Sequence, residues 1–208
     1  MLPIETAVSF LTASVLLALA PGPDNLFVLT QSAVQGRTAG LAIMLGLCTG
    51  LIGHTLSVTL GVAVIFKTSA IAFSVLKYIG AAYLAYLAWR MFRASAGTIG
   101  GGRGEEVRIW KLYIRGIVMN VTNPKVSIFF LAFLPQFAEP ARGPLWIQML
   151  MLGGLFILAT ILVFGAMALL AGTFGQWLNR SEGIQKIMNR TAGVVFLGLA
   201  LKLAATRQ

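Results

Sequence analysis

The first long apolar run of the chain, Leu2–Val34, is interrupted in its middle by Pro21-Gly22-Pro23-Asp24-Asn25. Proline inside a helix removes a backbone donor and clashes with the preceding turn. This stretch therefore predicts the end of one half-helix and the start of another, with Pro23 at the first helical position, where its missing N–H is harmless. In hydrocarbon, unpaired backbone groups are costly, so such a break persists only where protein or water surrounds it.

A second interruption lies in the fourth apolar run, Leu112–Phe137, and reads Asn120-Val121-Thr122-Asn123-Pro124-Lys125. Asn123 is a good N-cap residue, and Pro124 suits the first position of the helix that follows. We expect both breaks to line one internal cavity. Each break also presents the positive end of a half-helix, which can hold an anion such as a carboxylate.

The composition places both breaks in a membrane protein. Of the 208 residues, 58% are hydrophobic and only 11% are charged, with a mean hydropathy of +0.86. Soluble domains are about half apolar and about a quarter charged, and a chain of this size would need a polar surface in water. The net charge of +10 does not indicate nucleic-acid binding, because the basic residues flank apolar runs as in cytoplasmic membrane loops.

A search for apolar runs of about 17–25 residues, the length that crosses a bilayer, gives six segments, of which the first is too long for one simple span and the sixth is short. They are Leu2–Val34, Ala39–Phe66, Ala70–Phe92, Leu112–Phe137, Leu145–Ala171 and Thr191–Ala204. Lys and Arg are concentrated in the loops after the first, third and fifth runs, which predicts that these loops are cytoplasmic and that both termini lie outside.

A glycine-rich linker, residues 95–107, separates two halves that resemble each other weakly, residues 1–94 and 108–208. Three spans per half would insert the second copy upside down, and inverted repeats with interrupted helices at matching positions are typical of transporters. We therefore predict an all-α membrane protein with a single domain, residues 1–208. Its six transmembrane helices form two inverted three-helix repeats, with helices 1 and 4 broken at the proline motifs.

Asp24 and Lys125 each follow the proline of one break by one residue. A charge near the bilayer centre costs about 3 kcal/mol on insertion scales and marks a functional candidate. The helix dipole favours Asp24 at a helix start but opposes Lys125 there. Two interpretations remain open: the residues pair as a buried structural clasp, or they face the cavity and hold a solute that carries both charges.

The sequence contains few of the residues that enzyme chemistry needs. The chain has one cysteine, Cys48, one histidine, His54, and one aspartate, Asp24, so we expect no disulfide, no metal centre and no cofactor. An intramembrane enzyme would need a nucleophile with a base, or a pair of acids, and neither is present. We expect His54 to be a packed, hydrogen-bonded residue. A passive channel or a non-catalytic membrane scaffold remains the alternative to a carrier.

Together, the two break motifs, the glycine-rich second run and Phe133-Leu134-Pro135-Gln136-Phe137 resemble the LysE/RhtB family of bacterial amino-acid exporters over the whole chain. The resemblance implies a multi-pass efflux carrier of the bacterial inner membrane for amino acids or related small metabolites, driven by the proton gradient. The motif positions carried over are Pro21, Gly22, Pro23, Asn25, Asn120, Asn123, Pro124 and Lys125. Asp24 is not among these positions.

Our hypothesis is an exporter with a cavity between the two broken helices. Lys125, Asn123 and the half-helix N-termini would hold the substrate carboxylate, and Asp24, with Asn25 nearby, would hold the ammonium group or a proton. Asn120 completes the predicted substrate-binding set. Rocking of one half against the other would give alternating access, with proton antiport through Asp24. The expected partners are an amino acid, protons and the lipid bilayer; a homo-oligomer is compatible with the sequence, which identifies no interface.

Overall fold

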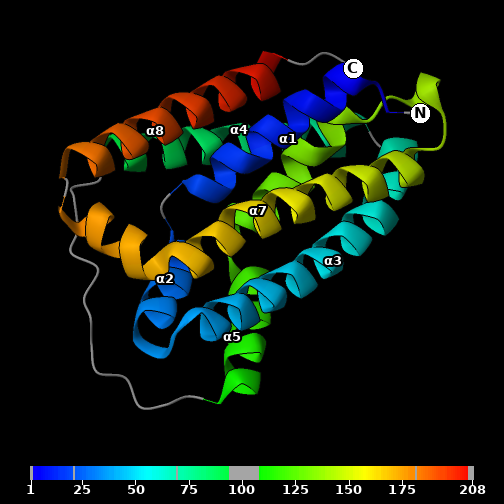
Figure 1. Cartoon of the computed structure of the whole chain (residues 1–208). Coiled ribbons are helices and arrows are strands. Elements are labelled where there is room, and N and C mark those ends of the chain that lie inside the picture. The colour runs from blue at the N-terminus through cyan, green and yellow to red at the C-terminus, as the bar shows by residue number, and fades with distance from the viewer. Residues whose placement is uncertain (1, 21, 69, 94–107, 181, 206–208) are drawn as a thin grey trace.

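The computed structural model describes residues 2–20, 22–68, 70–93, 108–180 and 182–205, and every regular element in this part of the chain is helical (Figure 1). The all-helical prediction is therefore confirmed for these residues. Pro21 and the predicted linker 95–107 lie outside them. The α-helices are α1 (Ile4–Leu19), α2 (Pro23–Gln35), α3 (Arg37–Thr68), α4 (Ala70–Arg93), α5 (Ile109–Thr122), α6 (Pro124–Ile128), α7 (Leu145–Arg180) and α8 (Glu182–Ala205).

Both predicted breaks are present. The axes of α1 and α2 differ by 62°, and those of α5 and the segment Pro124–Phe137 differ by 50°. Each second half begins with its proline, Pro23 in α2 and Pro124 in α6. Proline stops the preceding helix and opens the next one because it lacks the N–H that a helix interior needs but a first turn does not.

Among the described residues, two helical stretches are long and apolar enough to cross a membrane, Arg37–Gly61 in α3 and Leu145–Ala171 in α7. The number rises to four if each bent pair counts as one span. The prediction of six spans goes beyond this range. The sixth predicted segment, Thr191–Ala204, forms only the later part of α8, which begins at Glu182.

The helices pack in two groups that share α1 (Figure 1). α3 packs against α5 and α7, α4 packs against α8, and α1 contacts both α7 and α8. α3 and α5 approach each other closely, and a side chain on Gly46 would overlap the backbone of Tyr113 and Gly116. A side chain on Gly50 would meet that of Asn120, whereas Gly53 has no neighbour in the described residues within 4 Å. Glycine at positions 46 and 50 thus permits close packing of α3 on α5.

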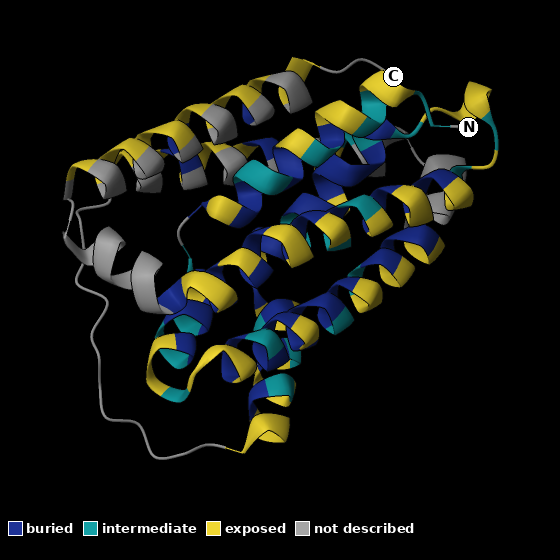
Figure 2. Ribbon diagram, in the orientation of Figure 1, coloured by how far each residue is buried: buried dark blue, intermediate teal, exposed yellow. Residues whose placement is uncertain are grey.

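Exposed residues lie along the outer faces of the helices (Figure 2), and many of them are large and apolar. On α3, Leu45, Ile52, Leu56 and Leu60 are all exposed, with Leu60 at 74%. They recur at helical spacing on one face, opposite the buried face that packs on α5 and α7. Contact of such a contiguous apolar surface with lipid is favourable, whereas its contact with water is not.

The fourth predicted run does not continue as an α-helix to Phe137. After α6 it becomes a π-helix, η1 (Phe129–Phe133), and then a 3-10 helix, η2 (Leu134–Phe137); a further 3-10 turn, η3, spans Pro140–Arg142. The ring of Phe129 lies 5.3 Å from that of Phe156 on α7, between centroids. π-turns are rare and occur often at functional sites, and this one adjoins the cavity described below.

Candidate functional site

The two breaks bring Asp24 and Lys125 into the interior of the bundle, where they are 3% and 8% exposed. Asn123 connects them. Its side-chain amide donates to Asp24 Oδ2 at 2.7 Å, and its Oδ1 accepts from the backbone N–H of Lys125 at 3.0 Å. The second contact is the N-cap that the sequence predicted for α6. One side chain thus ties the start of α6 to the carboxylate at the start of α2.

The ammonium group of Lys125 lies at the C-terminal end of α1. Its Nζ donates to the carbonyl oxygens of Leu17, at 3.3 Å, and Ala20, at 3.1 Å. The last carbonyls of a helix have no partner within it and form the negative end of its dipole, so a cation is favoured there. Lys125 and Asp24, both of which the structure describes, form no ion pair within 4.0 Å. The direct clasp is therefore not formed.

The end of α1 also receives Asn25. The amide of Asn25 donates to the carbonyl of Ala18 at 2.7 Å and lies 3.9 Å from the sulfur of Met167. Gly22 lies beside Lys125, because a side chain at position 22 would come within 3.2 Å of Nζ. The first break is thus closed by side chains from α2 and α6.

The second break contacts α3. The Oδ1 of Asn120 lies against Gly50, and the backbone carbonyl of Asn120 lies 3.2 Å from His54 Nε2. The imidazole also packs on Phe130, with 5.6 Å between ring centroids. The expectation that His54 is packed and hydrogen-bonded agrees with these contacts.

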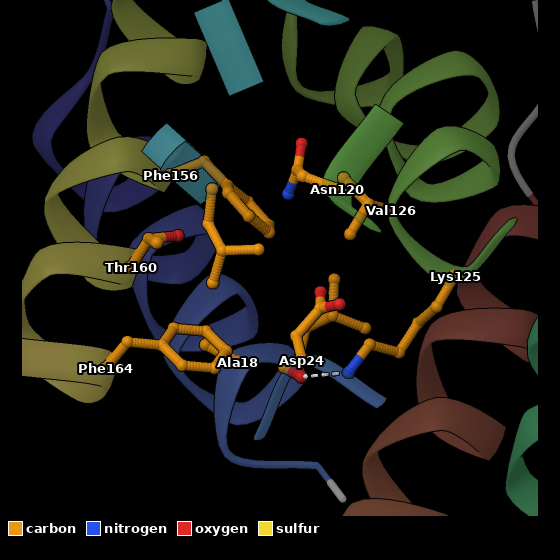
Figure 3. Close-up of a pocket in the computed structure, with 10 residues that line it drawn as sticks. Ala18, Asp24, Asn120, Lys125, Val126, Phe156, Thr160 and Phe164 are labelled. Atoms are coloured by element: carbon orange, nitrogen blue, oxygen red, sulfur yellow. Dashed lines mark hydrogen bonds between the residues drawn. The ribbon is translucent and has the colours of Figure 1, made fainter. Parts of the chain in front are cut away.

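A small cavity lies where the broken helices meet (Figure 3). It measures about 20 Å³, which is room for about one water molecule. All of its lining residues are buried. Because the cavity is too small for an amino acid, such a ligand enters only if the helices move apart. The lining consists of Leu17, Ala18, Asp24, Leu47, Asn120, Lys125, Val126, Phe156, Thr160 and Phe164.

Three buried side-chain oxygens accept no hydrogen bond from the described residues: Asp24 Oδ1, Asn25 Oδ1 and Asn120 Oδ1. A buried acceptor without a donor costs about 1–3 kcal/mol. All three belong to residues predicted to bind substrate, and two of these residues line the cavity. The site therefore has acceptor capacity that a donor group could satisfy.

Three of the five predicted binding residues line the cavity: Asp24, Asn120 and Lys125. Asn25 and Asn123 do not line it but donate hydrogen bonds to two residues that do, Ala18 and Asp24. Sequence reasoning missed the wall contributed by α7, namely Phe156, Thr160 and Phe164. These residues lie at i, i+4 and i+8, which places them on one helix face. An apolar helix carries no signal that says which face meets a cavity.

Metal binding has no support in the part of the chain that the structure describes, where no three His, Cys, Asp or Glu side chains are grouped to hold an ion. The polar groups at the site are instead one carboxylate, one ammonium, amides and a hydroxyl. Such groups suit recognition of a small polar molecule by hydrogen bonds and charge.

The profile of the LysE type translocator family matches residues 15–207. The chain belongs to this family. Family membership makes it a membrane transporter and not an enzyme. No solved structure is significantly similar to this chain.

Curated relatives match this chain over nearly its full length. A homoserine/homoserine lactone efflux protein of Salmonella typhi is 33% identical, with 96% of each chain covered. An uncharacterized membrane protein of Vibrio cholerae is 31% identical, with 98% of each chain covered. An uncharacterized membrane protein of Pseudomonas aeruginosa is 30% identical over 94% of this chain and 93% of its own.

Proposed function

We propose that this translocator is a multi-pass protein of the bacterial inner membrane that exports amino acids or closely related small metabolites. The family and the relative named as a homoserine/homoserine lactone efflux protein support export. The observation that carries the proposal is the small cavity at the meeting point of two broken helices, lined by one buried carboxylate and one buried ammonium group.

In the proposed architecture, residues 1–94 and 108–208 form two inverted repeats of three spans, joined by the linker 95–107. The matching construction of the two breaks supports this arrangement. In each, an α-helix ends, a proline opens the next helix, and a charged residue follows the proline, Asp24 in α2 and Lys125 in α6. Interrupted helices at corresponding positions of two repeats mark the binding site in many transporters.

The substrate carboxylate would bind Lys125 and Asn123, with the N-terminal ends of α2 and α6. Lys125 has three N–H donors, and the two contacts to α1 leave one for a ligand. The substrate ammonium would bind Asp24, whose Oδ1 accepts no hydrogen bond from the described residues, with Asn25 and Asn120 supplying further polar contacts. Their unpaired oxygens support a ligand that brings N–H donors.

Transport would proceed by alternating access with proton antiport. The small volume of the cavity supports a carrier over a passive channel, because a bound amino acid requires the two halves to separate. A proton on Asp24 removes the charge that attracts the substrate ammonium, so proton and substrate would occupy the site in turn. Protons entering along their gradient would release substrate on the outer side.

We expect Asp24→Asn to retain the hydrogen bond from Asn123, because the new amide keeps an acceptor oxygen. The variant cannot take up a proton, so acceleration of amino-acid export by an imposed pH gradient should fall at least about tenfold. Proteoliposomes loaded with labelled amino acid measure this effect. The matched control, Glu5→Gln, changes an exposed acid on α1 and should behave as wild type. An Asp24→Asn protein with wild-type response to the pH gradient would remove Asp24 from the coupling.

A further inference from the structure

The described part of the chain buries one negative and one positive side chain. Among the residues whose burial the structure describes, Asp24 and Lys125 are the only charged side chains that are buried, and both line the cavity. A buried charge without a partner is strongly unfavourable, whereas opposite charges at one site offset each other. A bound solute must therefore supply one positive and one negative group to leave both residues paired.

The rest of the cavity wall is uncharged. Thr160 and Asn120 are its other polar residues, and the remaining lining is aliphatic or aromatic, including Phe156 and Phe164 on α7. Figure 3 shows the Thr160 hydroxyl pointing into the space across from Asp24 and Lys125, between the two phenylalanine side chains. The wall of α7 therefore offers one hydroxyl on an apolar surface to whatever lies opposite the two charges.

We propose that the site selects zwitterionic amino acids with a small, uncharged side chain, and that Thr160 is the residue that contacts that side chain. This inference rests on the proposed function. The α-ammonium group of the substrate binds Asp24 and its α-carboxylate group binds Lys125, so that the substrate side chain lies against α7. A lysine or glutamate side chain brings an additional charge, for which the wall holds no partner. Thr160 hydrogen-bonds a hydroxyl-bearing side chain, which an apolar side chain of the same shape cannot match.

Counterflow in proteoliposomes of the purified protein tests the selectivity, with labelled threonine, valine, lysine and glutamate as probes. For wild type we expect threonine counterflow at least about tenfold faster than that of lysine or glutamate, a difference of about 1.4 kcal/mol. Lysine or glutamate exchanging as fast as threonine would overturn the inference. Absence of counterflow for every amino acid would instead overturn the proposed function, and this inference with it.

Two substitutions at position 160 test the assignment of the residue. Thr160→Asp adds a negative charge and should raise the ratio of lysine to threonine counterflow at least about tenfold. Its control, Thr38→Asp, places the same charge on the exposed first turn of α3, where it should leave the ratio unchanged. If Thr160→Asp elutes from a size-exclusion column as wild type does and keeps the wild-type ratio of lysine to threonine counterflow, the role of Thr160 would be overturned.

Thr160→Val preserves shape and removes the hydroxyl, so it decides the question if the aspartate variant does not fold. Threonine and valine are themselves nearly isosteric. The ratio of threonine to valine counterflow should fall at least about fivefold in Thr160→Val, because the substrate hydroxyl loses its partner. An unchanged ratio would show that α7 does not contact the substrate side chain.

Discussion

Lys125→Met is expected to reduce amino-acid counterflow by at least about 100-fold and to lower the thermal stability of the protein in detergent. The substitution removes both hydrogen bonds to the end of α1, from Nζ to the carbonyls of Leu17 and Ala20. Each unpaired buried acceptor costs about 1–3 kcal/mol. It also leaves the buried charge of Asp24 without the opposite charge of Lys125 nearby, and an uncompensated buried charge is strongly unfavourable.

The control for this variant is Lys111→Met, which removes an exposed cation from α5 and should retain wild-type counterflow and stability. The double variant Asp24→Asn/Lys125→Met separates the two roles. Removing both charges should recover part of the lost stability but none of the transport. Wild-type counterflow in Lys125→Met, or a double variant no more stable than Lys125→Met alone, would contradict the assigned role of the lysine.

Gly46→Ala is expected to destabilise the protein, although alanine is intrinsically the better helix former. A side chain at this position overlaps the backbone of Tyr113 and Gly116 in α5, and overpacking of this kind costs about 1–3 kcal/mol. The apparent melting temperature should therefore fall by several degrees. Because α5 ends at the second break, the displacement should also slow counterflow.

Gly53→Ala, two helical turns further along α3, is the matched control. No described atom lies within 4 Å of the added side chain, so only the helix propensity changes, by about 0.5–1 kcal/mol in favour of alanine. Thermal unfolding followed by size-exclusion chromatography compares the two. A Gly46→Ala protein as stable as Gly53→Ala would show that α3 and α5 are not in the close contact described.

Local chemistry predicted the breaks but not the partners that close them. Pro23 and Pro124 open their helices as expected, since proline excludes a continuous helix whatever surrounds it. Lys125 seemed anomalous at a helix start. In the structure its ammonium group binds a carbonyl at the C-terminal end of α1, which is distant in sequence but close in space. Contacts of this kind depend on how the helices pack, which no local pattern contains.

The wall of the cavity illustrates the same limit. Asp24, Asn120 and Lys125 could be predicted because polar residues beside a proline break in an apolar segment are conspicuous. Phe156 and Phe164 belong to a helix that is apolar on all sides, where the face toward α1 and the face toward lipid look alike. The π-helix after α6 was also missed, because its sequence differs little from that of an ordinary apolar α-helix.

The central claim is that the cavity between the two broken helices opens to water and binds the substrate. Cysteine accessibility tests it most directly, with Ala18→Cys in the cavity wall and Cys48→Ala to remove the native thiol. A small water-soluble thiol reagent should modify Ala18→Cys, and saturating amino acid should slow the reaction. Ala132→Cys, buried in the core outside the cavity wall, should not react. Absence of reaction at position 18, or a rate that no amino acid changes, would contradict the account.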